Sequence, residues 1–198
     1  MLLNIHSDNP DRRKIAQVIK TLQNGGVIIY PTDTVYAFGC DINNQKAIEK
    51  ICRIKGIDPN KTNLSFICSN ISQITSYIKP IDNSIFRDMK ANLPGAFTYI
   101  LRANNTVPKL FKNRKKTVGV RIPDNNIALT LVEELGNPIL SSSVKNEDDE
   151  IFGYYTDPID IDEKYGNLVD LIIDGGISTG KGSKIVDCTG SEPILIRE

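Results

Sequence analysis

Two hydroxyls and a carboxylate stand together directly after a short apolar run in the first quarter of the chain. The run follows a Gly-Gly pair, and it predicts a buried strand over residues 27–30. Pro31 ends the pairing, and Thr32, Asp33 and Thr34 then place polar side chains at the end of the strand. Open α/β sheets bind ligands at strand ends, so this tripeptide is a candidate binding site. The alternative is an ordinary strand exit, in which these side chains satisfy nearby backbone groups.

Two cations stand at positions where predicted elements end. Lys55 follows a predicted helix over residues 45–54, and Arg121 is the last residue of a predicted strand over residues 117–121. A guanidinium at a strand end can hold a carboxylate or a phosphate through two parallel hydrogen bonds. Both residues are therefore candidate anion ligands, although a solvated lysine at the end of a helix needs no function.

A third group of candidates is a cluster of cations in the middle of the chain. The cluster comprises Lys109, Lys112, Arg114, Lys115 and Lys116. Residues 1–121 hold 19 Lys and Arg against 8 Asp and Glu, whereas residues 122–198 hold 5 against 16. Clustered cations attract phosphate backbones, which favours a nucleic-acid partner unless the two halves of the chain neutralise each other in the fold.

The elements that must position these side chains alternate between helix and strand. Apolar residues at helical spacing predict helices at 8–24, 45–54, 69–77, 84–92 and 126–135. The first has a start signal at Asp8 or Asn9, and the last is stopped by Gly136. Apolar or alternating runs predict strands at 27–30, 64–68, 97–102, 117–121, 139–143, 168–173, 184–188 and 193–196. A polar, acidic loop is predicted at 146–150. The pattern indicates a single α/β domain over residues 1–198 with a mixed, twisted open sheet.

The composition is that of an ordinary globular protein. Hydrophobic residues make up 40% and charged residues 24% of the 198-residue chain. No apolar run approaches the roughly 20 residues of a membrane helix, and no signal-peptide pattern follows Met1. We therefore expect a cytoplasmic protein with no membrane partner. The four cysteines lack CxxC spacing and His6 is the one histidine, so we expect free thiols and no zinc site.

Five segments carry a family resemblance that covers nearly the whole chain. They are Tyr30-Pro31-Thr32-Asp33-Thr34-Val35-Tyr36, Ile54-Lys55-Gly56, Pro94-Gly95-Ala96-Phe97-Thr98, Val118-Gly119-Val120-Arg121-Ile122-Pro123 and Ser141-Ser142-Ser143. With them the chain resembles the threonylcarbamoyl-AMP synthase superfamily, which includes the YrdC and YciO proteins. The resemblance implies a YrdC-like three-layer α/β fold with a basic concave surface, first recognised as a module that binds nucleotides and double-stranded RNA. It also implies a reaction of L-threonine, bicarbonate and ATP that yields threonylcarbamoyl-AMP and pyrophosphate, for modification of the adenosine beside the tRNA anticodon.

The resemblance also assigns roles to single residues. Lys55 resembles the catalytic lysine on the loop over the ATP phosphates. Arg121 resembles the arginine that binds the threonine carboxylate, and Thr34 resembles the hydroxyl that faces the same amino acid. The further residues that the resemblance places around threonine or the nucleotide are Thr117, Ser141, Ser143, Ser183 and Arg197. Attack on the α-phosphate builds negative charge on phosphate oxygens, so we expect Mg²⁺ to accompany ATP.

The chain departs from the pattern of active synthases at three places. Ile57 stands where they have an arginine, Lys145 stands where they have an asparagine, and acidic residues from Glu147 onward replace a Ser-Gly turn. Isoleucine supplies none of the five donors of a guanidinium, and lysine supplies a charge without the paired donor and acceptor of an amide. The segments at residues 51–54, 94–99 and 171–176 resemble the YciO branch, which lacks the full synthase pattern.

Two functions from different classes follow from these observations. The first is a YciO-type nucleotidyltransferase that binds ATP and L-threonine and retains weak L-threonylcarbamoyladenylate synthase activity linked to tRNA processing. The second is a non-catalytic protein that binds tRNA or other structured RNA through the basic concave surface. Lys55, Thr34 and Arg121 favour the enzyme, whereas the cations at residues 109–116 favour RNA binding.

Overall fold

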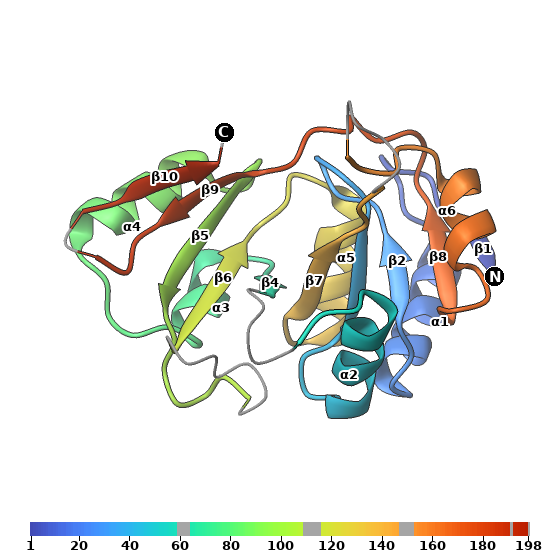
Figure 1. Ribbon diagram of the computed structural model, residues 1–198, viewed down its shortest axis with the longest axis horizontal. Helices are drawn as coiled ribbons and strands as arrows, with labels where there is room; N and C mark the ends of the chain where they lie inside the picture. Colours follow the sequence, from blue (N-terminus) through green and yellow to red (C-terminus); the bar gives the residue numbers. More distant parts are fainter. Residues whose placement is uncertain (59–63, 109–115, 147–152, 191, 198) are drawn as a thin grey trace.

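One large sheet organises the protein, whose computed structural model describes residues 1–58, 64–108, 116–146, 153–190 and 192–197. The strands found in these ranges are β1 (Leu2–Asn4), β2 (Ile28–Tyr30), β3 (Ala37–Asp41), β4 (Ser65–Ile67), β5 (Phe97–Arg102), β6 (Thr117–Arg121), β7 (Ile139–Ser143), β8 (Leu171–Asp174), β9 (Lys184–Asp187) and β10 (Ile194–Arg197). Their order in the sheet is β1-β8-β2-β3-β7-β4-β6-β5-β9-β10 (Figure 1). Parallel pairs such as β2 with β8 and antiparallel pairs such as β3 with β7 both occur, so the sheet is mixed, as predicted.

Helices cover both faces of this sheet. They are α1 (Arg12–Gln23), α2 (Gln45–Ile54), α3 (Ile71–Thr75), α4 (Asn83–Asn92), α5 (Asn126–Leu135) and α6 (Pro158–Tyr165). Helices α1 and α5 share one buried apolar cluster, which contains Leu22 and Leu131. The other helices contribute to a second cluster, to which α2 supplies Ile51 and α4 supplies Met89. Helix, sheet and helix form three layers, which confirms the predicted fold class.

The sheet twists strongly between its two ends. In Figure 1, α2 lies in front of the strands on the right, whereas α4 lies behind β5, β9 and β10 on the left. Both helices nevertheless pack on the same apolar cluster, so they lie on the same face of the sheet. The twist rotates this face from the viewer's side at α2 to the far side at α4. The cluster under α1 and α5 contains no residue of β5, β6 or β9. Among the described residues, side chains of β5, β6 and β9 on this half of the second face, such as Thr98, Arg121 and Ile185, line a cavity instead.

Capping residues set the ends of the helices close to their predicted positions. Helix α1 begins after Asp11, whose carboxylate accepts hydrogen bonds from two backbone N–H groups of the first turn. The predicted start at Asp8 or Asn9 is therefore wrong by one turn. Helix α5 covers the predicted residues 126–135 and ends at Gly136, whose φ of +79° is the left-handed conformation that glycine adopts without strain.

Three elements of the structure were not predicted from the sequence, namely β1, β3 and α6. Strand β3 pairs antiparallel with both β2 and β7 in the middle of the sheet. The ring of Tyr30 crosses Gly39 of β3 so closely that a Cβ atom there would come within 2.6 Å of a ring carbon. Glycine is therefore required at this position, and a glycine within a short run hides the strand from a search for apolar patterns.

Two predicted features lie outside the described residues. They are the cations Lys109, Lys112, Arg114 and Lys115 and the acidic part of the loop from Glu147. Lys116 is described, and it precedes β6 with a positive φ of 52°. Among the helices of the described ranges, none is long and apolar enough to cross a membrane.

Candidate functional site

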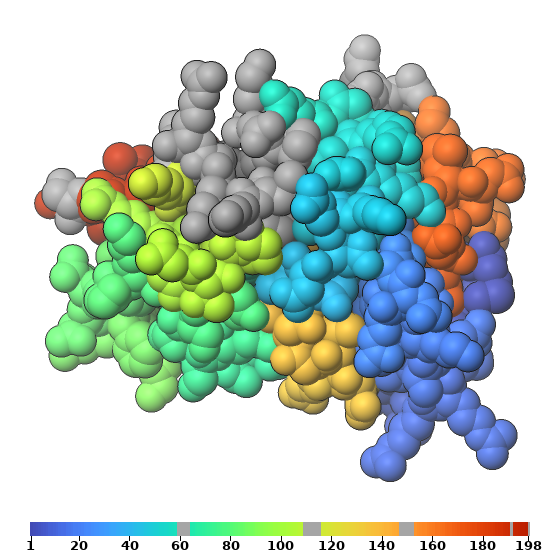
Figure 2. Space-filling view, turned by 90° about the horizontal axis from the view of Figure 1, so that it is seen from below, coloured from blue at the N-terminus to red at the C-terminus, as the bar shows by residue number. Residues whose placement is uncertain are grey.

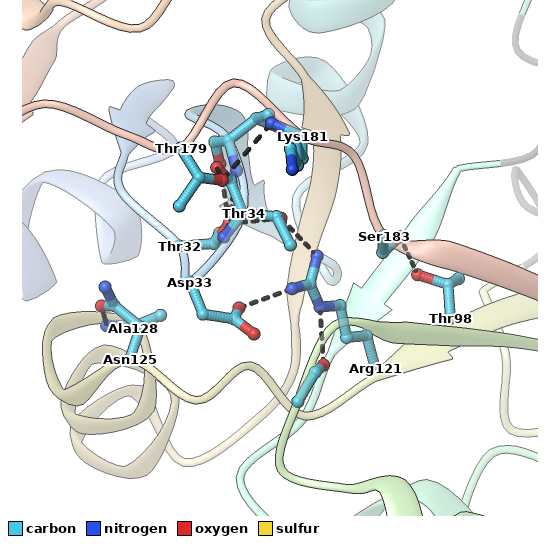
Figure 3. A network of polar contacts seen from close by, with 12 residues as sticks. Thr32, Asp33, Thr34, Thr98, Arg121, Asn125, Ala128, Thr179, Lys181 and Ser183 are labelled. Atoms are coloured by element: carbon cyan, nitrogen blue, oxygen red, sulfur yellow. Dashed lines mark hydrogen bonds and ion pairs between the residues drawn. The ribbon is translucent and has the colours of Figure 1, made fainter. Parts of the chain in front are cut away.

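A buried guanidinium forms the centre of the site. Arg121 ends β6 and is 6% exposed. Its Nη1 donates to Thr34 Oγ1 at 2.8 Å, its Nη2 donates to Asp33 Oδ1 at 2.5 Å, and its Nε donates to the Gly95 carbonyl at 3.3 Å (Figure 3). Burial lowers the pKa of Arg121, and the neighbouring Asp33 carboxylate opposes that shift. The sheet thus holds a fixed positive charge at the place where the sequence predicted an anion ligand.

The Thr32-Asp33-Thr34 turn satisfies its own backbone and also reaches Arg121. Thr32 Oγ1 donates to the Val35 carbonyl at 2.7 Å and lies 3.2 Å from the Val35 backbone nitrogen. It also lies 3.0 Å from Thr34 Oγ1, which accepts from the guanidinium. The interpretation as a strand exit that satisfies nearby backbone groups is therefore confirmed for Thr32, whereas Thr34 and Asp33 hold the arginine, and ligand binding at this tripeptide stays a prediction.

The segment after β8 crosses over this turn and fixes it from the other side. Thr179 Oγ1 donates to the Thr34 carbonyl at 2.8 Å (Figure 3). The Tyr36 hydroxyl donates to the Gly176 carbonyl at 2.6 Å and accepts from the Gly175 N–H at 3.1 Å. Burial raises the pKa of Tyr36 to about 12, so this hydroxyl stays protonated at neutral pH. The turn is thereby locked between β6 and the β8–β9 connection.

A cavity of about 800 Å³ opens beside Arg121, at the ends of β7 and α2. The cations that line it are Arg53, Lys55, Arg121, Lys145, Lys164 and Arg197. Three successive serines of β7 add hydroxyls, and the described part of the lining contains no Asp or Glu. A wall of cations and hydroxyls suits a ligand that carries several negative charges.

Lys55 lies at the end of this cavity next to the central strands β3 and β7. It is the C-cap of α2, and its Nζ donates to the Ser143 carbonyl at 2.5 Å. The same ammonium lies 5.3 Å from the centre of the Phe38 ring, which is within the range of a cation–π contact. Ile57 lines the cavity two residues further on. A charged and an apolar side chain therefore stand next to each other at this end.

Ser183 and Arg197 close the opposite wall. Ser183 is buried, and its hydroxyl lies 2.8 Å from Thr98 Oγ1. Arg197 donates twice to the Ser183 carbonyl, through Nε at 2.9 Å and Nη2 at 2.7 Å, and its Nη1 donates to the Tyr154 hydroxyl at 3.1 Å. The last strand of the sheet is thus tied to the segment that enters β9.

The structure brings most of the predicted site residues together. Those that line the cavity are Lys55, Arg121, Ser141, Ser143, Ser183 and Arg197. Thr34 accepts a hydrogen bond from Arg121. Thr117 instead lines a second cavity of about 640 Å³, together with Lys79, Arg102 and Lys116. Four positions along a strand separate side chains by roughly 13 Å, which explains why Thr117 and Arg121 line different cavities.

Two cations of the cavity were missed. Arg53 lies in the segment at residues 51–54, which was used only for the family resemblance. Its position two residues before Lys55 could have indicated that it lines the cavity. Lys164 had no such signal, because it lies in the last turn of α6, which was not predicted. Both side chains are exposed at the mouth of the cavity.

Comparisons with known proteins agree with this architecture. A family model named Sua5_yciO_yrdC, with the description "Telomere recombination", matches residues 20–198. The Escherichia coli (strain K12) protein named "Uncharacterized protein YciO" is 41% identical over 195 residues, which cover 98% of this chain and 93% of that protein. The crystal structure of E. coli YciO has a TM-score of 0.93 at 39% identity and covers 100% of this chain and 95% of that chain.

Similarity extends to proteins named as synthases. A threonylcarbamoyl-AMP synthase of Saccharophagus degradans is 34% identical over 130 residues, or 66% of this chain and 68% of that protein. The crystal structure of P. abyssi Sua5 complexed with L-threonine has a TM-score of 0.88 at 26% identity. That match covers 100% of this chain and 57% of the P. abyssi chain.

Fold and site together define a three-layer α/β protein with a cavity lined by cations and hydroxyls at the ends of its central strands. With the match over residues 20–198 and these relatives, the chain belongs to the Sua5/YciO/YrdC family. The similarity to E. coli YciO covers nearly all of both chains and exceeds the similarity to the S. degradans synthase. The predicted resemblance to the YciO branch is therefore confirmed.

Proposed function

We propose that the protein is a nucleotidyltransferase that joins L-threonine, bicarbonate and ATP into threonylcarbamoyl-AMP and releases pyrophosphate. One observation carries the proposal: the buried Arg121 guanidinium borders a cavity whose lining supplies five further cations. The existence of relatives named threonylcarbamoyl-AMP synthase, and of a Sua5 structure with L-threonine, supports it. The activity would serve tRNA processing in the cytoplasm.

The carboxylate of L-threonine would bind to Arg121. A guanidinium has five N–H donors. Three of them are directed at Thr34, Asp33 and the Gly95 carbonyl. Counting partners in the described ranges alone, one N–H remains on each terminal nitrogen, and two such donors can hold a carboxylate bidentately. The hydroxyls of Ser141, Ser143 and Ser183 would then contact the amino acid or the nucleotide.

The phosphates of ATP would lie against Lys55, with Arg197 nearer the nucleoside. Threonine and bicarbonate give a carbamate with loss of water, and a carbamate oxygen attacks the α-phosphorus while the bond to pyrophosphate breaks. The charge that builds on the phosphate oxygens is stabilised by cations already in place. Mg²⁺ would enter with ATP, because the described lining offers it hydroxyls and cations but no carboxylate, and no cluster of three His, Cys, Asp or Glu side chains occurs elsewhere in the described ranges.

The activity would be weak because the phosphate end lacks the arginine and the asparagine of the synthase pattern. Ile57 and Lys145 line the cavity in place of the arginine and asparagine of the synthase pattern. An isoleucine offers the triphosphate no hydrogen bond, and a lysine cannot reproduce an amide. Lys55 would also have to exchange its hydrogen bond to the Ser143 carbonyl for one to a phosphate oxygen.

The test is an assay of pyrophosphate release. Purified protein is given ATP with Mg²⁺, bicarbonate and L-threonine, and reactions without threonine and without bicarbonate serve as controls. We expect release that requires both substrates and that the Arg121→Gln variant loses. A folded protein that releases no pyrophosphate in response to threonine contradicts the proposal.

A second function, RNA binding, is favoured by one specific observation. The second cavity carries Lys79, Arg102 and Lys116 on the uncovered half of the sheet, together with a single acidic residue, Asp187. Cations spaced along an open surface suit a phosphate backbone rather than a small molecule. The enzyme needs none of these side chains, so salt-dependent RNA binding that survives loss of the Arg121 site would establish this function separately.

A further inference from the structure

Helix α6 brings an additional lysine to the phosphate end of the cavity. Lys164 occupies the last turn of α6 and lines the same cavity as Lys55. Figure 2 shows the segments around α2 and α6 next to each other on one surface, in cyan and orange. Neither a hydrogen bond nor an ion pair ties the Lys164 ammonium to another side chain within the described ranges.

An aromatic contact fixes the position of this lysine relative to Lys55. The ring of Tyr165 packs edge-on against Phe38, with ring centres 5.1 Å apart, and the Lys55 ammonium lies 5.3 Å from the centre of the same Phe38 ring. Tyr155 packs on the other side of Tyr165 at 5.9 Å. The two segments that carry Lys55 and Lys164 therefore both contact the Phe38 ring.

The helix itself is held firmly. Asp157 caps its first turn by accepting a hydrogen bond from the Ile159 N–H at 2.8 Å, and Pro158 occupies the first helical position. Ile161 is fully buried beneath it. The backbone of α6 is thus fixed, and the long side chain of Lys164 extends over the cavity from a defined point.

Ile57 adds an apolar side chain to the same cavity. It lines the cavity and packs its side chain on the main apolar cluster, so it offers no charge to a phosphate. We propose that Lys164 binds the β- and γ-phosphates of the nucleotide and supplies the positive charge that Ile57 does not. This assignment rests on the proposed function, because it concerns the phosphate end of the same site.

The test measures binding of inorganic tripolyphosphate, ATP and AMP by calorimetry. The proteins are the wild type, Lys164→Gln, Ile57→Arg and the variant that combines both substitutions. Lys20→Gln is the matched control, because Lys20 lies in the last turn of α1 and lines neither cavity. We expect Lys164→Gln to weaken tripolyphosphate and ATP binding about tenfold, as for the loss of one charged hydrogen bond, and AMP binding by less than about threefold.

Rescue separates phosphate binding from a structural role. If Lys164 supplies the missing charge, adding Ile57→Arg to Lys164→Gln should restore most of the tripolyphosphate affinity. Unchanged affinity in Lys164→Gln, beside a wild type that binds tripolyphosphate, overturns this assignment and leaves the proposed function standing. A weakened variant that Ile57→Arg fails to restore also overturns it. A wild type that binds neither tripolyphosphate nor ATP refutes the proposed function as well.

Discussion

The two ends of the cavity are built differently. At the inner end, Arg121 is 6% exposed and three of its donors are satisfied by Asp33, Thr34 and Gly95. At the outer end, Lys145 and Lys164 are exposed and extend from the surface beside the apolar Ile57. The inner end is therefore organised before any ligand arrives; at the outer end Lys55 is held by Ser143 and Phe38, whereas the exposed Lys145 and Lys164 must be ordered when a ligand binds.

This difference has an energetic consequence. Ordering a flexible side chain at an interface costs about 0.5–1.5 kcal/mol, and a group already held by its neighbours avoids that cost. Hydrogen bonds to Asp33, Thr34 and Gly95 already hold Arg121, so substitutions of Arg121 should affect the free energy of unfolding as well as ligand binding. Substitutions at the outer end should affect binding alone.

The largest effect is expected from Arg121→Met. The substitution leaves the Asp33 carboxylate, whose side chain is 14% exposed, without its partner. Removal of one member of a buried pair typically costs about 3–5 kcal/mol of unfolding free energy. Urea unfolding measures it, and Asp33→Asn in the same background should recover part of the loss.

An exposed ion pair provides the control for this experiment. Lys50 and Asp170 are 2.8 Å apart with side chains 38% and 44% exposed. Lys50→Met should therefore cost less than about 1 kcal/mol. Equal losses from Arg121→Met and Lys50→Met would show that the inner end contributes no special stability, and the contrast between the two ends would fail.

The next largest effect is expected at the outer end. Lys55→Ala should weaken ATP binding by about 1.5–3 kcal/mol, which is the scale of a charged hydrogen bond, and should leave the urea midpoint nearly unchanged. Calorimetry measures the affinity. Lys46→Ala, in the first turn of the same helix, is the matched control because Lys46 lines neither cavity. Nucleotide binding that is equal in both variants would remove Lys55 from the site.

A smaller gain is expected from restoring the synthase pattern. The combined variant Ile57→Arg and Lys145→Asn returns groups that complement phosphate and amino-acid oxygens, so adenylate formation should rise about tenfold, or about 1.4 kcal/mol in the barrier. Each single change should do less, since residues of one site are not additive. A combined variant that folds normally and gains no pyrophosphate release would mean that the outer end binds its ligand in another way.

Part of the inner end could be predicted from the sequence because its charged side chain, Arg121, stands at the end of a predicted strand. The strands at residues 117–121 and 139–143 were predicted with their observed bounds, and Arg121 followed as a cation at a strand end, whereas Ser141 and Ser143 came from the family resemblance. Their apolar neighbours and the proline after Arg121 are local signals. The hydrogen bonds between Arg121, Thr34 and Asp33 could not be predicted, since they join residues about 90 positions apart.

The outer end escaped prediction because it depends on elements with weak local patterns. Helix α6 is eight residues long and carries three acidic residues among few apolar ones. The helix was therefore not predicted, and Lys164 could not be assigned to any element. Thr117 is a contrasting case: the resemblance predicts it around threonine or the nucleotide, and the structure places it four positions before Arg121 on β6, where it lines the second cavity. Spacing along a strand therefore constrains a site more tightly than the type of residue does.

The smallest effect per residue is expected on the open half of the sheet, where the two functions can be separated. If Lys79 and Lys116 bind RNA phosphates, changing both to Gln should weaken binding to every duplex alike. The slope of log affinity against log salt should flatten by about two units, since each phosphate contact on a duplex contributes about 0.9. Fluorescence anisotropy over a salt series measures both quantities.

The control for this experiment is the pair Lys46→Gln and Lys90→Gln, because these lysines lie on helices and line neither cavity. It removes the same charge, so any loss through net charge alone appears in both proteins. The Lys79 and Lys116 variant should keep its threonine-dependent pyrophosphate release, because neither side chain borders the Arg121 cavity. A salt slope that is the same in both variants would exclude the second cavity as an RNA site, and the cations of the Arg121 cavity would then be the place to look for phosphate binding of any kind.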